Sequence, residues 1–262
     1  MTRAALQFII LVAAFLLTWF LLSKIQFTEN MEIEKFSKEQ EKKLGELLLD
    51  GLKQSHDLIR NDSINEIVDS IFNEICRTNK IDGSQIKVLI LDNSEVNAFA
   101  LPGDQLVVLT GLIKYCKTPE ELAGVMAHEI SHIQKDHVMK KLVKEVGVAM
   151  LFVIIGGNGS FEIISEVLRT ISSRAFDRDQ ETDADMNAVK LLANAKINPT
   201  GLSDFLFRLS QESDELADDL IILSTHPGSA ERTAEIVKES KKYSKNYVPL
   251  KFAYWENRNK TQ

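Results

Sequence analysis

Two histidines four residues apart, on a helix with a clear start motif, limit the possible fold of this chain more than any other feature of its sequence. Thr118-Pro-Glu-Glu121 is typical of a helix start: a threonine N-cap, a proline in the first helical position and a glutamate that closes a capping box. We expect this helix to run through His132 to about Lys141. His128 and His132 then lie one turn apart within it, separated by about 40° around the axis.

The segment His128-Glu-Ile-Ser-His132 predicts a metal site. From one helical face the two imidazoles can bind one ion, while Glu129, turned by about 100°, reaches a metal-bound water rather than the metal. This is the H-E-x-x-H arrangement of zinc peptidases, with Glu129 as the candidate general base. Two histidines that merely share a face are the alternative interpretation.

A catalytic zinc site also needs a third protein ligand and an open position for water. Glu181-Thr-Asp-Ala-Asp185 offers two carboxylates on one helical face, so Glu181 could bind zinc while Asp185 accepts the outer N–H of a ligating histidine. His137 falls about 180° round a continuous helix from His128, so we interpret it as a solvated residue or as a support behind a ligand. An acidic helix start favoured by the helix dipole is the alternative for the neighbouring carboxylates: Asp177, Asp179 and Asp183.

The remaining patterns predict a mainly α-helical chain with one small β-sheet, the α+β class. Ile86–Leu91 and Leu106–Leu109 are β-branched-rich runs on either side of Asn97–Asp104, whose Pro-Gly-Asp turn supports a strand on each side. Ser63-Ile-Asn-Glu66 is typical of a capping box. Apolar residues recur at helical spacing in the other predicted helices, which are 37–54, 161–176, 177–195, 200–212 and 229–240.

One further run, residues 146–155, carries no charge and is too short to cross a bilayer. A core helix is the default interpretation of this run. The functional alternative is a helix that touches a membrane or guards a cleft.

The segment from Ala4 to Leu22 contains no charged residue and is long enough, at about 1.5 Å per residue, to cross a hydrocarbon core of roughly 30 Å. A cleaved signal peptide has a shorter apolar stretch and a small-x-small cleavage site, and no A-x-A follows this run. We therefore expect an uncleaved single-span anchor, with a cleaved signal as the alternative. Arg3 favours an inside N-terminus, although basic residues on the far flank oppose it.

These patterns divide the chain into four parts. We expect an N-terminal anchor at 1–23, a polar linker at 24–36, a main domain at 37–245 and a C-terminal tail at 246–262. With its N-terminus inside, as Arg3 favours, the anchor leaves the main domain outside the cytoplasm.

Composition excludes two broad classes of protein. With 31 Lys and Arg against 38 Asp and Glu, the net charge is −7, which argues against a nucleic-acid partner. Hydrophobic residues at 44% and charged residues at 26% exclude wholesale disorder. The two cysteines, Cys76 and Cys116, are too few for a disulfide scaffold and form either one bridge or two buried thiols.

Four ordered blocks resemble the HtpX-like and CAAX-prenyl-endopeptidase-like zinc metallopeptidases, a gluzincin family, and within it the small membrane-anchored periplasmic branch. The resemblance covers about Glu66 to Val237. Its blocks are Asn97-Ala-Phe-Ala-Leu-Pro-Gly103, His128-Glu-Ile-Ser-His132, Arg178-Asp-Gln-Glu-Thr-Asp-Ala-Asp185 and Ser224-Thr-His-Pro-Gly-Ser-Ala-Glu-Arg232. The resemblance implies a zincin-type metallopeptidase domain that holds one Zn²⁺ per chain.

The resemblance also implies roles for individual residues. It implies that Glu181 is the third zinc ligand and that Asp185 supports a ligand without touching the metal. It implies that His226 and Arg232 lie near the metal and take part in catalysis. His226 would either stabilise the oxyanion or cap the zinc in a resting state.

Together these features predict a zinc-dependent metalloendopeptidase that cleaves unfolded or misassembled proteins in envelope quality control. We expect it in the bacterial inner membrane, with its domain in the periplasm. An extended polypeptide substrate would pair with the edge of the small sheet at Asn97, Ala98, Phe99 and Ala100. The main alternative is a non-catalytic, membrane-tethered chaperone or binding module on the same fold. The sequence leaves the oligomeric state open.

Overall fold

The structure is a computed structural model. It describes residues 36–59, 61–211, 220–226, 229–243 and 246–258, together with positions 7, 11, 12 and 15. Apart from those four positions, the expected anchor and linker up to residue 35 lie outside the described residues. Within the described part of the chain, no helix combines the length and the apolar character that a membrane crossing needs.

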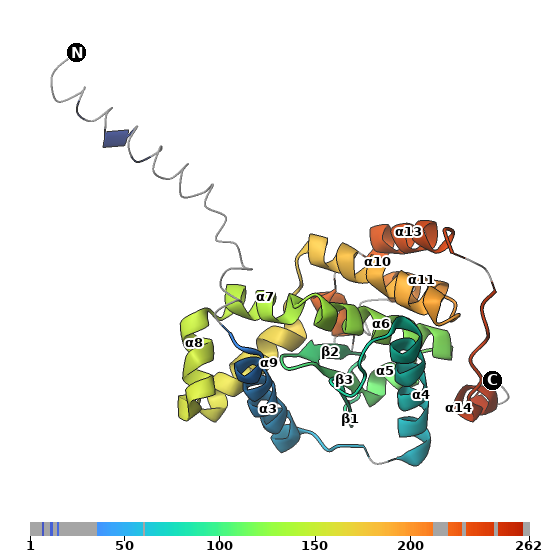
Figure 1. Ribbon diagram of the computed structural model, residues 1–262, viewed down its shortest axis with the longest axis horizontal. Helices are drawn as coiled ribbons and strands as arrows, with labels where there is room; N and C mark the ends of the chain where they lie inside the picture. The colour runs from blue at the N-terminus through green and yellow to red at the C-terminus, as the bar shows by residue number, and fades with distance from the viewer. Residues whose placement is uncertain are drawn as a thin grey trace.

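A three-stranded sheet forms the β part of the domain (Figure 1). Its strands are β1 (Lys87–Leu91), β2 (Ala98–Leu101) and β3 (Gln105–Leu109), in the order β1-β3-β2. β1 pairs with β3 in parallel, and β2 pairs with β3 antiparallel. The turn between β2 and β3 places Gly103 at φ 71° and Asp104 at φ 56°, a left-handed conformation suited to the predicted Pro-Gly-Asp turn. The two predicted strands are confirmed as β1 and β3, but the turn joins β3 to β2, which lies inside the Asn97–Asp104 stretch expected to separate them.

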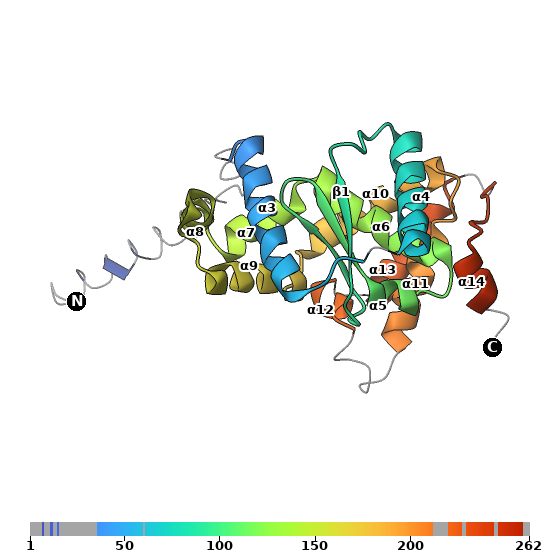
Figure 2. The same cartoon turned by 90° about the horizontal axis from the view of Figure 1, so that it is seen from below.

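Helices surround the sheet in layers (Figures 1 and 2). These helices are α3 (Lys38–Ser55), α4 (Asp62–Asn79), α6 (Pro119–Gln134), α9 (Phe161–Ser173), α10 (Arg178–Asn194), α11 (Thr200–Gln211) and α13 (Ser229–Ser240). α6 packs against β2 and β3 on one side and against α10 and α11 on the other, while α3 and α9 also contact β2. α6 therefore lies at the centre of the domain and is buried along nearly its whole length. The mainly α, α+β fold class is confirmed.

The sequence predicts the start of α3 correctly but places the start of α4 wrongly. The helix predicted at 37–54 is α3, and the Ser37 side chain caps it by accepting from the Gln40 N–H at 3.2 Å. The capping box predicted at Ser63 is wrong, because α4 begins at Asp62. The side chain of Asn61 accepts the N–H groups of Ser63 and Ile64 and caps this helix instead.

The helix expected to continue to Lys141 is interrupted. α6 ends at Gln134, Asp136 adopts a left-handed φ of 54°, and a second helix, α7 (His137–Glu145), begins directly after it. Because the chain turns at Asp136, His137 does not continue the α6 helix, and it contacts His132 instead. The angle of about 180° expected for His137 is therefore wrong.

The remaining described elements are short helices, and two of them lie at opposite ends of the domain. They are α5 (Thr110–Tyr115), α8 (Val148–Val153), the π-helical turn η1 (Ile154–Asn158), α12 (Ile222–Thr225) and α14 (Ala253–Arg258). In both views α8 and α14 lie at opposite ends of the domain (Figures 1 and 2). Residues 246–258, assigned from sequence to a tail, pack on the domain, where the Trp255 indole donates to the Cys116 carbonyl at 3.0 Å. Cys76 and Cys116 are both buried thiols, and neither is part of a disulfide.

Candidate metal centre

α6 carries the first two histidines into the centre of the molecule. Its N-cap, Thr118, accepts the Glu121 N–H at 3.3 Å, as the sequence predicts. The Glu121 carboxylate accepts from Lys117, one residue before the N-cap, so the predicted reciprocal box is displaced by one position. Ten residues into this helix, the Nε2 atoms of His128 and His132 lie 2.9 Å apart, and both side chains are buried.

α10 brings a carboxylate to the same point. A reciprocal capping box between Asp177 and Gln180 starts this helix, which packs along α6. Glu181 lies in its first turn and is buried, with Oε1 3.3 Å from His132 Nε2 and Oε2 3.6 Å from His128 Nε2. The predicted Glu181 and the two histidines of the motif are therefore together.

A third imidazole completes the cluster. His226 follows the short helix α12, which is held in place where the Phe176 N–H donates to the Thr225 carbonyl at 3.2 Å. His226 Nδ1 lies 2.8 Å from Glu181 Oε1 and 3.2 Å from His128 Nε2. One ligand atom from each of the four residues lies within 4.8 Å of the others.

The spacing of these donors and the neutral state of their rings fit one bound metal ion. In a tetrahedral site with bonds of about 2.0–2.1 Å, neighbouring ligand atoms lie about 3.3 Å apart, close to the separations found here. Burial lowers the pKa of each imidazole, that of His132 to about 4, which leaves each ring neutral and able to bind a metal. Burial raises the pKa of Glu181, but its interactions with His226 and His128 outweigh burial and hold it well below the usual value.

The predicted general base lies beside the donors and beside the sheet. Glu129 is fully buried, and its Oε2 accepts the backbone N–H of Ala100 in β2 at 3.1 Å. Its Oε1 is 3.3 Å from His226 Nε2. Burial, and then the negative charge of Glu181, raises the pKa of Glu129 well above its usual value. A carboxylate with a raised pKa is suited to accept a proton and to release it again.

Asp185 and Arg232 form a buried pair behind the donors. Asp185 Oδ1 lies 2.9 Å from His128 Nδ1, the ring nitrogen that faces away from the cluster. Arg232 donates to both oxygens of Asp185, at 2.7 and 2.8 Å, and its Nη1 lies 2.5 Å from Glu181 Oε2. The same Nη1 donates to the His226 carbonyl at 3.1 Å. One guanidinium thus contacts three of the predicted site residues.

His137 occupies the matching position behind the second histidine. Its Nδ1 is 3.0 Å from His132 Nδ1, and its Nε2 is 3.7 Å from the Asp183 carboxylate. His137 is buried. Of the two interpretations of this residue, the structure therefore favours a support behind a ligand over a solvated position.

Two neighbours of the site were missed by sequence reasoning. The Phe176 ring stacks on His132 with centroids 4.0 Å apart and also lies over His226. Lys141 is buried 4.1 Å from the centroid of Phe176, and its ammonium donates to the carbonyls of Ile171 and Arg174 at the end of α9. The sequence signal for Lys141 was its place in a short run that is otherwise mostly apolar, Val138-Met-Lys-Lys-Leu-Val143.

The predicted substrate strand lies at an edge of the sheet but is covered. Asn97, Ala98, Phe99 and Ala100 are all buried, and the Ala98–Leu101 strand has β3 on one side only. α9 contacts β2, and the Asn97 amide donates to the Ser172 carbonyl at 3.5 Å. The structure thus places these residues next to Glu129 with a helix over them.

An H-E-x-x-H helix beside a sheet edge, joined by a glutamate from a later helix, defines a metal centre of the zincin class. The chain belongs to peptidase family M48, whose family model matches residues 61–240. This confirms the family resemblance seen in the sequence motifs.

Three curated proteins illustrate the relationship. The chain is 29% identical to the mitochondrial metalloendopeptidase OMA1 of Arabidopsis thaliana over 60% of this chain and 32% of that protein. It is 23% identical to a putative beta-barrel assembly-enhancing protease of Vibrio cholerae, over 82% of this chain and 46% of the relative. With the metalloprotease LoiP of Escherichia coli it shares 27% identity over 60% of this chain and 64% of the relative. The chain therefore spans less than two thirds of the length of these relatives.

Proposed function

We propose that this chain is a zinc-dependent metalloendopeptidase. The observation that carries the proposal is the convergence of His128, His132, Glu181 and His226 beside the buried carboxylate of Glu129. His128, His132 and Glu181 would hold the ion, with the fourth position open to water in the active form. A bound zinc ion would supply Lewis acidity, which activates water at neutral pH and polarises the scissile carbonyl.

Glu129 is the general base of the proposed reaction. Its carboxylate takes a proton from the attacking water and passes it to the leaving amine of the peptide. The Ala100 N–H fixes one oxygen of this carboxylate, so the side chain is oriented before substrate arrives. This hydrogen bond also connects the base directly to the strand on which we propose that substrate pairs.

Asp185 and Arg232 position the ligands. Asp185 lies 2.9 Å from the outer ring nitrogen of His128 and would accept its N–H, which would fix the tautomer that presents Nε2 to the metal. Arg232 holds Asp185 by two hydrogen bonds and contacts Glu181 and the His226 carbonyl. Because Arg232 contacts these three groups, we propose that it acts by holding them in position. We propose that His226, rather than Arg232, stabilises the oxyanion.

His226 has two proposed roles, one in each state of the enzyme. In the arrangement described above, its Nδ1 lies among the candidate metal donors, where it would take the place of water on a bound ion. In this resting state the imidazole restrains hydrolysis. In the active form the displaced ring would donate to the oxyanion that forms on the substrate.

Substrate would be an extended polypeptide that pairs with β2. Main-chain pairing at Asn97–Ala100 reads backbone rather than side chains, which suits unfolded or misassembled proteins of many sequences. Because α9 covers β2, this segment must move before a substrate strand can add. The name of the Vibrio cholerae relative, a putative beta-barrel assembly-enhancing protease, supports a role in envelope quality control.

We also propose that residues 4–22 anchor the chain in the bacterial inner membrane, with the domain in the periplasm. Nineteen successive uncharged residues, Ala4 to Leu22, support the anchor, and Arg3 before them supports the orientation.

The proposed activity can be tested with the full chain in detergent and casein as substrate. We expect cleavage to stop when a chelator removes the metal and to return when zinc is added back at one ion per chain. Magnesium, which prefers six oxygen ligands, should not restore it. A chain that binds zinc but never cleaves casein would instead be the non-catalytic chaperone or binding module considered above.

A further inference from the structure

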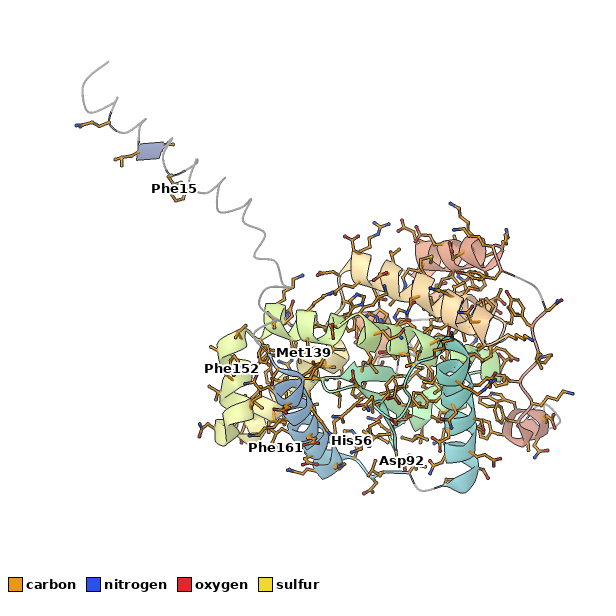
Figure 3. All side chains as sticks on the ribbon, in the orientation of Figure 1. Phe15, His56, Asp92, Met139, Phe152 and Phe161 are labelled. Atoms are coloured by element: carbon orange, nitrogen blue, oxygen red, sulfur yellow. The ribbon has the colours of Figure 1, made fainter. Side chains whose placement is uncertain are left out.

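The α8 end of the domain carries an apolar surface that the proposed reaction does not use. From Val146 to Phe161 the chain contains no charged residue. Four large apolar side chains of this segment are exposed, and we call them the α8 surface: Met150 (40%), Phe152 (37%), Val153 (40%) and Phe161 (51%). Phe152 and Phe161 both lie at this end of the molecule (Figure 3).

The segment is apolar on two sides. Leu151, Ile154 and Ile155 are buried in the core, while the α8 surface faces away from it. At Gly157 an added side-chain carbon would meet no atom within 4 Å, so open space also lies beside η1. A short helix that is apolar all round is typical of an element covered on both sides, by protein on one and by a second apolar phase on the other.

The α8 surface lies next to the point where the N-terminal segment enters the domain. Phe36, the first residue of the continuous described chain, stacks on Phe152 with ring centroids 4.8 Å apart and planes 10° apart. Residues 23–35 connect Phe36 to the uncharged run at 4–22. A connector of this length spans at most about 47 Å when fully extended, which limits how far Leu22 can lie from Phe36.

We propose that the α8 surface docks on the lipid bilayer into which residues 4–22 insert. The occupant is a lipid surface because the exposed part of the segment offers apolar side chains without charges for specific pairing, and the chain that enters beside it is itself apolar enough to span a bilayer. The inference rests on the membrane attachment proposed above. Docking at α8 would hold the opposite end, with α14, away from the membrane (Figure 1).

Nitroxide labels on the full chain in vesicles of phosphatidylethanolamine and phosphatidylglycerol can test this inference. Cysteine is introduced singly as Met150→Cys, Phe152→Cys or Phe161→Cys, with Phe207→Cys and Val248→Cys as exposed controls remote from α8. The unsubstituted chain, taken through the same labelling, measures any signal from the buried Cys76 and Cys116. Collision with oxygen, which concentrates in lipid, is compared with collision with a water-soluble nickel chelate.

We expect labels at 150, 152 and 161 to collide preferentially with oxygen, at a depth of about 5–10 Å, and both controls to collide preferentially with nickel. If the chain sediments with the vesicles but all five labels favour nickel, docking is wrong while the anchor stands. If the chain does not sediment with vesicles, both the attachment and the docking are wrong. Dipolar broadening at 152 that persists at high dilution in lipid would assign the surface to a second copy and overturn the proposal. Casein cleavage in detergent is independent of all these outcomes.

Discussion

At the scale of single residues, the proposed centre depends on supports as much as on ligands. His128 has Asp185 behind it, His132 has His137 behind it, and Arg232 ties Asp185 to Glu181. Outer partners of this kind fix ring orientation and tautomer before a metal binds. The ligands and their supports therefore predict different effects when they are replaced.

Replacing Glu181 with alanine should abolish zinc binding, because it removes the carboxylate that completes the ligand set. Asp179→Ala on the same helix is the matched control and should keep its zinc, since Asp179 is exposed. Elemental analysis of both purified variants measures the zinc content per chain. A Glu181 variant with full zinc would show that the ligand assignment is wrong.

Asp185→Ala should weaken zinc binding without abolishing it. The expected loss is roughly 10–100-fold in affinity, because the variant loses the orientation of His128 but keeps every ligand. Competition with a zinc chelator of known affinity measures the change. Unchanged affinity would contradict the positioning role that the structure suggests for Asp185.

His226→Ala should raise the basal rate of casein cleavage at equal zinc occupancy. The variant removes an imidazole that lies among the metal donors, so water can reach the fourth position without a conformational change. Ser224→Ala, an exposed change in the same segment, is the control and should leave the rate unaltered. A fall of roughly 10²–10³ would instead assign His226 to the oxyanion alone.

At the scale of elements, the position of α6 is fixed by close contact with α11. A side-chain carbon on Gly124 in α6 would lie 2.7 Å from the Leu202 backbone nitrogen, and one on Gly201 in α11 would lie 2.3 Å from the Glu120 carbonyl oxygen. The two glycines thus let the helices approach until their backbones nearly touch. The position of α6 in turn places His128 and His132 against α10.

Gly124→Ala should destabilise the domain by about 1–3 kcal/mol, because the added methyl group cannot fit without separating α6 from α11. Gly156→Ala is the control, since its nearest neighbour would be 3.8 Å away. Denaturant unfolding of the two variants and the parent chain compares their midpoints. Equal midpoints for the two glycine variants would contradict the close approach of these helices.

Sequence patterns predicted most elements but not the points where the chain turns. Apolar spacing was sufficient for α3 and α13, because burial of one helical face depends on local periodicity. The end of α6 was missed because the left-handed turn at Asp136 has no glycine or proline to signal it. Asn61 was missed as the cap of α4 because a serine two residues later offered an equally good motif.

Local patterns likewise predicted only part of the candidate site. The spacing of His128 and His132 was sufficient to predict their convergence, since a single helix fixes it. The spacing of two carboxylates on one helical face left Glu181 only a possible ligand, and the family resemblance was needed to choose it. Phe176 and Lys141 reach the site through tertiary packing between α7, α9 and the segment before α10, which no local pattern encodes.

At the scale of the whole molecule, we expect the chain to behave as an integral membrane protein. It should remain in the membrane fraction after a high-salt wash, because insertion of the uncharged residues 4–22 is hydrophobic and is not screened by ions. A chain that lacks residues 1–23 is the control and should be recovered in the soluble fraction. Release of the full chain by salt alone would show peripheral attachment.

The central claim, that Glu129 acts as a base beside a bound zinc ion, is tested most directly by Glu129→Gln. Glutamine keeps the shape of the side chain and an oxygen for the Ala100 N–H, but it cannot take a proton. Zinc content and casein cleavage are measured on the same preparation of this variant and of the parent chain. We predict about one zinc per chain in both and a loss of cleavage of at least roughly 10²-fold in the variant. Cleavage at the parental rate by a zinc-loaded Glu129→Gln chain would contradict the proposed mechanism.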